Sequence, residues 1–176
     1  MAEGGQQAAT MWELLDRAAE LERRVGALYA QFAEVFRHLP LVAAFWRELA
    51  GEERLHALIV GAAREVFPPT APALPGGWSQ QLEQIDKLLT RIEAGVSAEL
   101  SLDQAFARAG EIEASELDTL RILIVEHAGT RFSRLAPLVG SSGVDRHRDK
   151  VLDRAQRSAT NRHEPTRRRG APAARQ

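Results

Sequence analysis

The stretch Glu53-Arg54-Leu55-His56 places a carboxylate and an imidazole three residues apart within a segment of helical pattern. Residues three apart on a helix share a face, so both side chains can reach one ion. Upstream, Glu22 interrupts an equally regular apolar stripe. The three ionisable residues together predict a metal site inside a helical bundle.

The composition supports an all-α fold. The 176 residues are rich in Leu, Ala, Glu and Arg, and only 6% of them are aromatic. The alternating Val, Ile and Thr pattern that is typical of strands is nearly absent. This mixture predicts an all-α protein, and the length suits one domain with a single core.

Several functions are excluded by residue types that the chain lacks. There is no cysteine, which excludes disulfides, thiolate zinc sites, iron–sulfur ligation and cysteine nucleophiles.

No apolar run approaches the ~20 residues needed to span a bilayer. The opening MAEGGQQAAT lacks the charged start and apolar segment of a secretory signal. We therefore expect a cytoplasmic protein with no membrane partner.

The hydrophobic pattern of the first part predicts two long helices. Residues 1–10 lack periodicity and are expected to be disordered. A first helix is expected over residues 11–37, and a second over residues 40–66, because Pro40 suits a first helical turn. The short connection makes them an antiparallel pair. The first is expected to bury Leu14, Leu15, Ala18, Leu21, Val25, Leu28, Tyr29, Phe32, Val35 and Phe36. The second is expected to bury Leu41, Val42, Phe45, Trp46, Leu49, Leu55, Val60 and Ala63.

The middle of the chain reads as a long crossover, residues 67–100. Its proline-rich start is incompatible with a helix or a central strand. A shorter amphipathic helix is expected over residues 79–94. Ser101 and Gln104 then have capping-box spacing, which opens a third long helix over residues 102–128.

A fourth helical stretch is expected over residues 133–158, although proline and glycine weaken its first half. The pairs 11–66 and 101–158, joined by the crossover, predict an antiparallel four-helix bundle over residues 11–158. Residues 159–176 are expected to form a disordered tail with five Arg and one Glu. A solvated tail is the simpler interpretation, and contact with nucleic acid or an acidic partner is the alternative.

The two helical pairs correspond at a fixed offset of 91 positions. Glu22 corresponds to Glu113, and His56 corresponds to His147. The chain has only five histidines, so this agreement supports a repeated arrangement of ligands. The repeat predicts that both halves contribute to one site.

Heptad spacing places four glutamates toward the bundle axis: Glu22, Glu53, Glu113 and Glu116. Leaving one buried carboxylate ionised and unpaired costs several kcal/mol, and four together require a cation. Oxygen and imidazole ligands without sulfur suit iron or manganese better than zinc. The pattern therefore predicts a metal centre.

The first half resembles the rubrerythrin group of the ferritin-like di-iron carboxylate proteins. The resemblance rests on Glu22 followed by Tyr29, and on Glu53-x-x-His56-Ala57. In that family two helices each give a glutamate and two others each give Glu-x-x-His.

In the second half, Glu113 and Glu116 resemble the two-glutamate third helix of rubrerythrins, and His147 resembles the final histidine. The resemblance covers roughly residues 12–156. It implies a di-iron oxidoreductase that reduces hydrogen peroxide or reacts with oxygen, with an external electron donor. Its implied metal ligands are Glu22, Glu53, His56, Glu113, Glu116 and His147.

One position departs from the family pattern. The glutamate expected three residues before His147 is Val144, and in the family that residue bridges two metals. The adjacent Asp145 is turned about 100° around a helix. Either Glu116 supplies the missing carboxylate, or the site holds one metal or two held asymmetrically. Oxidation of ferrous iron for storage is an alternative function, and a metal-free adaptor or oligomerisation bundle is another.

The simpler interpretations of these residues remain open at this stage. Glu22, Glu53 and His56 could lie on a solvated flank, and Glu113, Glu116 and His147 could belong to charged surfaces. Tyr29 is expected to pack in the core or to form a hydrogen bond to a residue that binds the metal. Bundles of this type commonly form homodimers.

Overall fold

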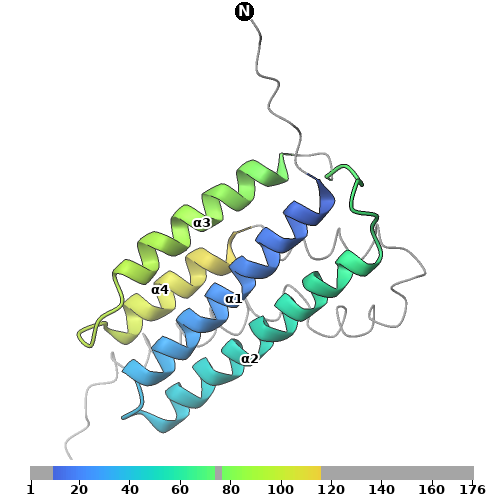
Figure 1. The fold of residues 1–176 in the computed structure, drawn as a ribbon. Coiled ribbons are helices and arrows are strands. Elements are labelled where there is room, and N and C mark those ends of the chain that lie inside the picture. Colours follow the sequence, from blue (N-terminus) through green and yellow to red (C-terminus); the bar gives the residue numbers. More distant parts are fainter. Residues whose placement is uncertain (1–9, 74–76, 116–176) are drawn as a thin grey trace, which may run out of the picture.

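The computed structural model describes residues 10–73 and 77–115, and this part is all-α (Figure 1). It contains α-helices and one short 3-10 helix, η1, and these described residues form no strand. The elements are α1 (Met11–Val35), α2 (Pro40–Ala62), η1 (Ala63–Glu65), α3 (Trp78–Ala94) and α4 (Leu102–Glu113). No helix in the described ranges combines the length and the apolar character needed to cross a membrane.

The first two helices have the expected bounds to within a few residues. Thr10 caps α1 in a capping box, because its side chain accepts from the Glu13 N–H while Glu13 Oε2 accepts from the Thr10 N–H. A turn after Val35 leads into α2, whose first residue is Pro40. The predicted tight break between two antiparallel helices is therefore confirmed.

The crossover contains the predicted shorter helix. Gly77 precedes α3 with a φ of 76°, a left-handed conformation that favours glycine. The predicted capping box at the start of α4 is confirmed, since the side chains of Ser101 and Gln104 each accept from the other residue's N–H. Pro72 also pairs with Thr10 in an isolated bridge, which ties the crossover to the start of α1.

The helix that begins at Leu102 ends earlier than expected. The prediction of one helix over residues 102–128 is wrong in the described part, because α4 ends at Glu113. The N–H of Ser115 donates to the Ile112 oxygen at 2.8 Å, a three-residue bond that tightens the chain into a turn. The predicted helix over residues 133–158 and the tail over residues 159–176 lie outside the described residues.

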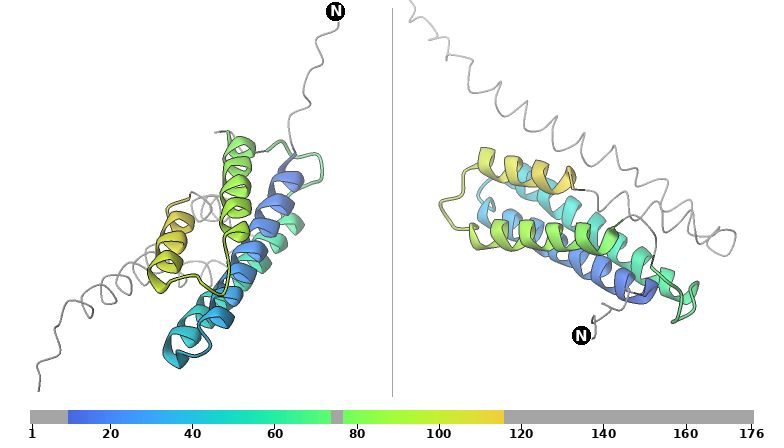
Figure 2. Two further views of the ribbon diagram at one scale, coloured as in Figure 1. Left: turned by 90° about the vertical axis from the view of Figure 1, so that its left-hand side faces the viewer. Right: turned by 90° about the horizontal axis from the view of Figure 1, so that it is seen from above.

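The axes of the four α-helices are roughly aligned with one another (Figures 1 and 2). α2 runs antiparallel to α1, and α3 lies along the other side of α1. α3 carries the chain back to the end of the molecule where α2 begins, so α4 runs in the direction of α2 (Figure 1). The long crossover thus spans the length of the helices.

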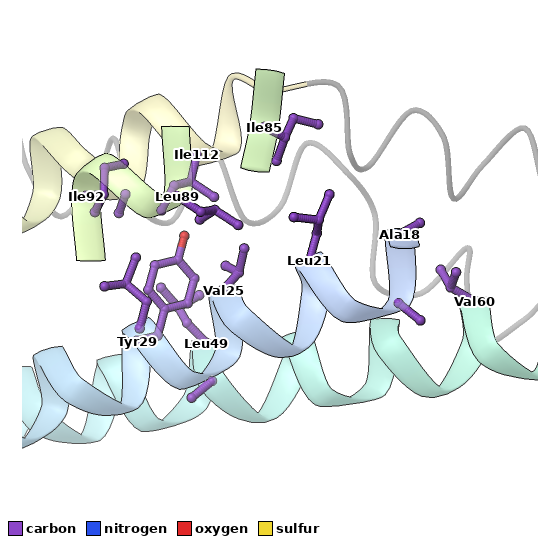
Figure 3. Close-up of a cluster of buried hydrophobic side chains, with 14 of the residues drawn as sticks. Ala18, Leu21, Val25, Tyr29, Leu49, Val60, Ile85, Leu89, Ile92 and Ile112 are labelled. Carbon is purple, nitrogen blue, oxygen red and sulfur yellow. The ribbon is translucent and has the colours of Figure 1, made fainter. Parts of the chain in front are cut away.

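A continuous apolar core joins all four α-helices. Leu21 and Val25 of α1 face Ile85 and Leu89 of α3, and Ile112 of α4 closes the same cluster (Figure 3). The predicted stripe of α1 is confirmed, since all of its positions are buried except the half-buried Val35. This stripe fixes the rotation of α1 about its axis.

The predicted core face of α2 is partly wrong. Leu41 is 77% exposed and Leu55 is 38% exposed, whereas Trp46, Leu49 and Val60 are buried as expected. α2 is apolar on more than one side, so its sequence alone did not fix its rotation. Contact with α1 chose the face that includes Trp46.

Candidate metal centre

Three ionisable side chains meet in the interface between α1 and α2. Glu22 is 2% exposed, Glu53 is 4% exposed and His56 is 1% exposed. α1 supplies the first residue, and one turn of α2 supplies the other two. Their predicted inward placement is confirmed, and the solvated-flank interpretation of these three residues is wrong.

One imidazole nitrogen of His56 lies near both carboxylates. Nδ1 of His56 is 3.0 Å from Oε2 of Glu53 and 3.8 Å from Oε2 of Glu22. At the shorter distance these two atoms are hydrogen-bonded, and the tautomer of the imidazole decides their donor and acceptor roles. One donor atom from each residue lies within 4.8 Å of the other two. The three side chains therefore form a group that could hold one metal ion.

The charges available within this trio are compatible with a divalent cation. Two carboxylates with a protonated imidazole carry a net charge of −1, and with a neutral imidazole they carry −2. A divalent cation held by two carboxylates and a neutral imidazole leaves no net charge. Because a buried charge is costly unless it is paired, the donor set fits a divalent metal ion.

Gly26 brings the two helices close together beside the trio. A Cβ at this position would lie 3.3 Å from both the Ala50 oxygen and the Glu53 Cβ. A larger residue would therefore press directly on the turn of α2 that carries Glu53. The sequence did not reveal this role of Gly26, because a glycine inside a helix shows its role only once its neighbour across the interface is known.

The interface changes character toward the turn between α1 and α2. Trp46 is fully buried, with ring centroids 5.1 Å from Phe32, 5.0 Å from Phe45 and 5.0 Å from Phe106. These contacts join α1, α2 and α4. The rings form a packed aromatic wall, and Trp46 lies about two helical turns before Glu53 on α2.

Tyr29 connects this wall to the second half of the chain. Its ring is fully buried and its hydroxyl points from α1 toward α3 and α4 (Figure 3). The hydroxyl donates to Oε1 of Glu113 at 2.6 Å. Tyr29 therefore donates a hydrogen bond to a predicted metal ligand, which is one of the two roles expected for it.

The remaining predicted ligands are not all placed with the trio. Glu113 is half-buried and does not join the group of donors within 4.8 Å of one another. Glu116, His147 and the unusual Val144 lie outside the described residues. The structure thus brings together Glu22, Glu53 and His56, and it places the fourth predicted ligand beside Tyr29.

A separate ionic cluster fastens α3 to the outer face of α1. Arg24 donates to Asp86 and to both carboxylate oxygens of Glu93, the latter at 3.0 and 2.8 Å. The hydrogen bond that Arg24 donates to Glu93 is the largest cause that raises the pKa of Arg24 above its ordinary value. This clamp was not predicted, since its members are 62 and 69 residues apart.

Comparisons with protein-family models, with curated proteins and with solved structures gave no match to this chain.

Proposed function

We propose that this chain is a ferritin-like metal protein of rubrerythrin type, with a dimetal centre between two helical pairs. The observation that carries the proposal is the buried trio of Glu22, Glu53 and His56, whose donor atoms lie within 4.8 Å of one another. Two helices supply a glutamate and a Glu-x-x-His, as one half of a ferritin-like site requires. The four-helix bundle and the second half of the site are part of the proposal.

Iron is the proposed metal, with manganese or a single ion as the nearest variants. Carboxylate and imidazole donors without sulfur suit these ions. Glu22, Glu53 and His56 would hold the first ion, and Glu113, Glu116 and His147 would complete the centre. When bound, iron would supply electrons and polarise the oxygen–oxygen bond of hydrogen peroxide or dioxygen.

The chain's own residues would bind the metal, balance its charge and keep the site dry. The two carboxylates of the trio would neutralise a divalent cation, and the trio residues are themselves buried, which would limit access of water to it. Tyr29 donates a hydrogen bond to Glu113, which fixes the orientation of that carboxylate. The chain has no cysteine for an internal rubredoxin-like centre, so the reductant would be an external donor.

A second candidate is a metal-free adaptor or oligomerisation bundle that keeps the ferritin-like fold. Val144 favours it, because the glutamate that bridges two metals in the family is missing there. The position of Glu113, bonded to Tyr29 rather than grouped with the trio, favours it as well. Oxidation of ferrous iron for storage would use the same centre as the first candidate.

Anaerobic titration of the full chain with Fe(II), followed by metal analysis, tests the proposal. We expect about two irons per chain for a complete ferritin-like centre and about one if only the trio binds. Exposure to hydrogen peroxide should then consume peroxide and produce a near-ultraviolet absorption band. A chain that binds neither Fe(II), Mn(II) nor Zn(II) leaves only the metal-free candidate.

Matched variants show whether the bound metal occupies this site. Glu53→Gln keeps the size of the side chain but removes its charge, so we expect iron affinity to fall by about 10–100-fold or more. Glu20→Gln makes the same change on the exposed side of α1, and we expect no loss. Equal affinity in both variants would place the metal elsewhere.

A further inference from the structure

Among the glycines inside the described helices, only Gly26 has another helix packed directly against it. A Cβ on Gly26 would lie 3.3 Å from the Ala50 oxygen and 3.3 Å from the Glu53 Cβ. The other glycines inside these helices are Gly51, Gly61 and Gly110. A Cβ on any of these three would meet no atom within 4 Å. The missing side chain of Gly26 therefore leaves a notch in α1, into which the backbone of α2 fits.

The notch at Gly26 lies beside the trio. Gly26 follows Glu22 by four residues, so the two residues share one face of α1. Across the interface, the side-chain atom nearest to the notch is the Cβ of Glu53. One member of the trio thus lies next to Gly26 on its own helix, and a second lies opposite it on α2.

The two distances within the trio depend on different parts of the structure. Nδ1 of His56 is 3.0 Å from Oε2 of Glu53, and both residues belong to one turn of α2. The same nitrogen is 3.8 Å from Oε2 of Glu22, which belongs to α1. The first distance is fixed within one helix, whereas the second changes whenever the spacing between the helices changes. The close contact at Gly26 limits that spacing.

We propose that Gly26 is a positioning residue, which holds Glu22 at the distance from Glu53 and His56 that a small divalent cation requires. This inference rests on the proposed metal binding by the trio. Zn(II) takes carboxylate and imidazole ligands at about 2.0–2.2 Å, whereas Ca(II) takes oxygen ligands at about 2.3–2.6 Å. The two kinds of site therefore differ by roughly 0.3 Å in the length of each bond to the ion.

One added methyl group would change the helix spacing by a similar amount. Carbon atoms in ordinary contact lie about 3.5–4.0 Å apart, which is farther than the 3.3 Å available between a Cβ on Gly26 and the Glu53 Cβ. Gly26→Ala should therefore push α2 away from α1 by a few tenths of an ångström. The shift would separate Glu22 from both ligands on α2, and the widened trio would suit a larger cation.

Competition titrations of the full chain with Zn(II) and Ca(II) test the role of Gly26. Zn(II) is the probe of small cations because it does not change oxidation state. We expect Gly26→Ala to lower the Zn(II) affinity about tenfold or more and the Ca(II) affinity much less, so the ratio of the two falls. Because the variant keeps the same three ligands, a change in this ratio reports their spacing and not their chemistry.

Two control variants separate positioning from other effects of a substitution. Gly51→Ala adds the same methyl group to α2 where no atom lies within 4 Å, so it should leave both affinities unchanged. Phe32→Leu removes packing from a fully buried position of α1. It should lower the melting temperature of the metal-free protein and leave the ratio of affinities unchanged. An equal fall of the ratio in Phe32→Leu would show general loosening of the interface and overturn the role of Gly26.

The remaining outcomes distinguish this inference from the proposed function. A wild-type chain that binds no divalent cation, or whose Zn(II) affinity is unchanged by Glu53→Gln, overturns the proposed site and the role of Gly26 with it. If Zn(II) binds through Glu53 while Gly26→Ala keeps the wild-type ratio, only the role of Gly26 is overturned. A wild-type chain that binds Ca(II) as tightly as Zn(II) also overturns that role, whether or not Gly26→Ala folds.

Discussion

The interface between α1 and α2 has an aromatic part and a polar part, which are built from the same two helices. Near the connecting turn, Tyr29, Phe32 and Trp46 pack ring against ring. Farther along, Glu22, Glu53 and His56 occupy equally buried positions. The aromatic part stabilises the fold through apolar burial, whereas the polar part places charge in a dry interior.

This difference should separate stability from the proposed metal binding. The aromatic part should contribute to folding whether or not a ligand is present. The polar part should favour folding strongly only when a cation binds it, because an ion that binds only the folded chain shifts the folding equilibrium. Variants of the two parts should therefore respond differently to metal.

The largest effect is expected at the aromatic part. Trp46→Ala should lower the free energy of unfolding by about 3–5 kcal/mol, because it leaves a large cavity among Phe32, Phe45 and Phe106. Urea denaturation followed by circular dichroism measures the change. If the metal-free and metal-loaded proteins lose different amounts of stability, the two parts are coupled and the separation is wrong.

Replacing the polar part by apolar side chains should raise the free energy of unfolding of the metal-free protein. Combining Glu22→Met, Glu53→Met and His56→Leu replaces the trio by apolar side chains of similar size. We expect the metal-free protein to gain about 1–4 kcal/mol in its free energy of unfolding, and iron binding to be lost. Urea denaturation with and without Fe(II) measures both effects. A loss of stability would show that the trio stabilises the fold through its own hydrogen bonds.

Tyr29 lies at the boundary between the two parts, and its hydroxyl can be removed without changing the ring packing. Tyr29→Phe should lower the free energy of unfolding by roughly 1.5 kcal/mol, because Glu113 loses a hydrogen bond to its half-buried carboxylate. Phe32→Leu is a useful comparison, since it changes packing alone. An unchanged stability in Tyr29→Phe would mean that water replaces the hydroxyl.

The smallest effect concerns the pH dependence of the start of α1. Hydrogen bonds from Thr10 lower the pKa of Glu13 below its ordinary value of 4.5. The folded state therefore gains stability from this carboxylate above pH 4.5, and loses it as the pH falls through the lower folded-state pKa. Glu13→Gln should remove this part of the acid sensitivity, as thermal melts between pH 3 and pH 7 would show. The acid sensitivity that remains can then be compared with the trio variant.

Local signals in the sequence determined most of the described helices. Pro40 predicted the start of α2, and the Ser101–Gln104 spacing predicted the start of α4. The apolar stripe of α1 has one clear direction, so it also predicted that Glu22 faces inward. These features depend on neighbours within a turn or two, which is why the sequence alone reveals them.

The helical pattern of the sequence gave wrong predictions where the structure depends on a distant segment of the chain. α2 has apolar residues on two faces, so its pattern could not tell that Leu41 and Leu55 stay outside while Trp46 goes inside. The predicted length of α4 was also wrong. The helix ends at the turn of Ala114 and Ser115, and neither residue is a strong helix breaker that the sequence would reveal.

By itself, the sequence determined that this protein is helical, where its first two helices turn, and which acidic residues interrupt their apolar stripes. Only the tertiary structure decided that Gly26 allows the close approach of α2, that Glu53 and His56 meet Glu22, and that Tyr29 reaches Glu113. The physical reason is that hydrogen bonds within helices are local. Distances between side chains on different helices depend on how the whole core packs.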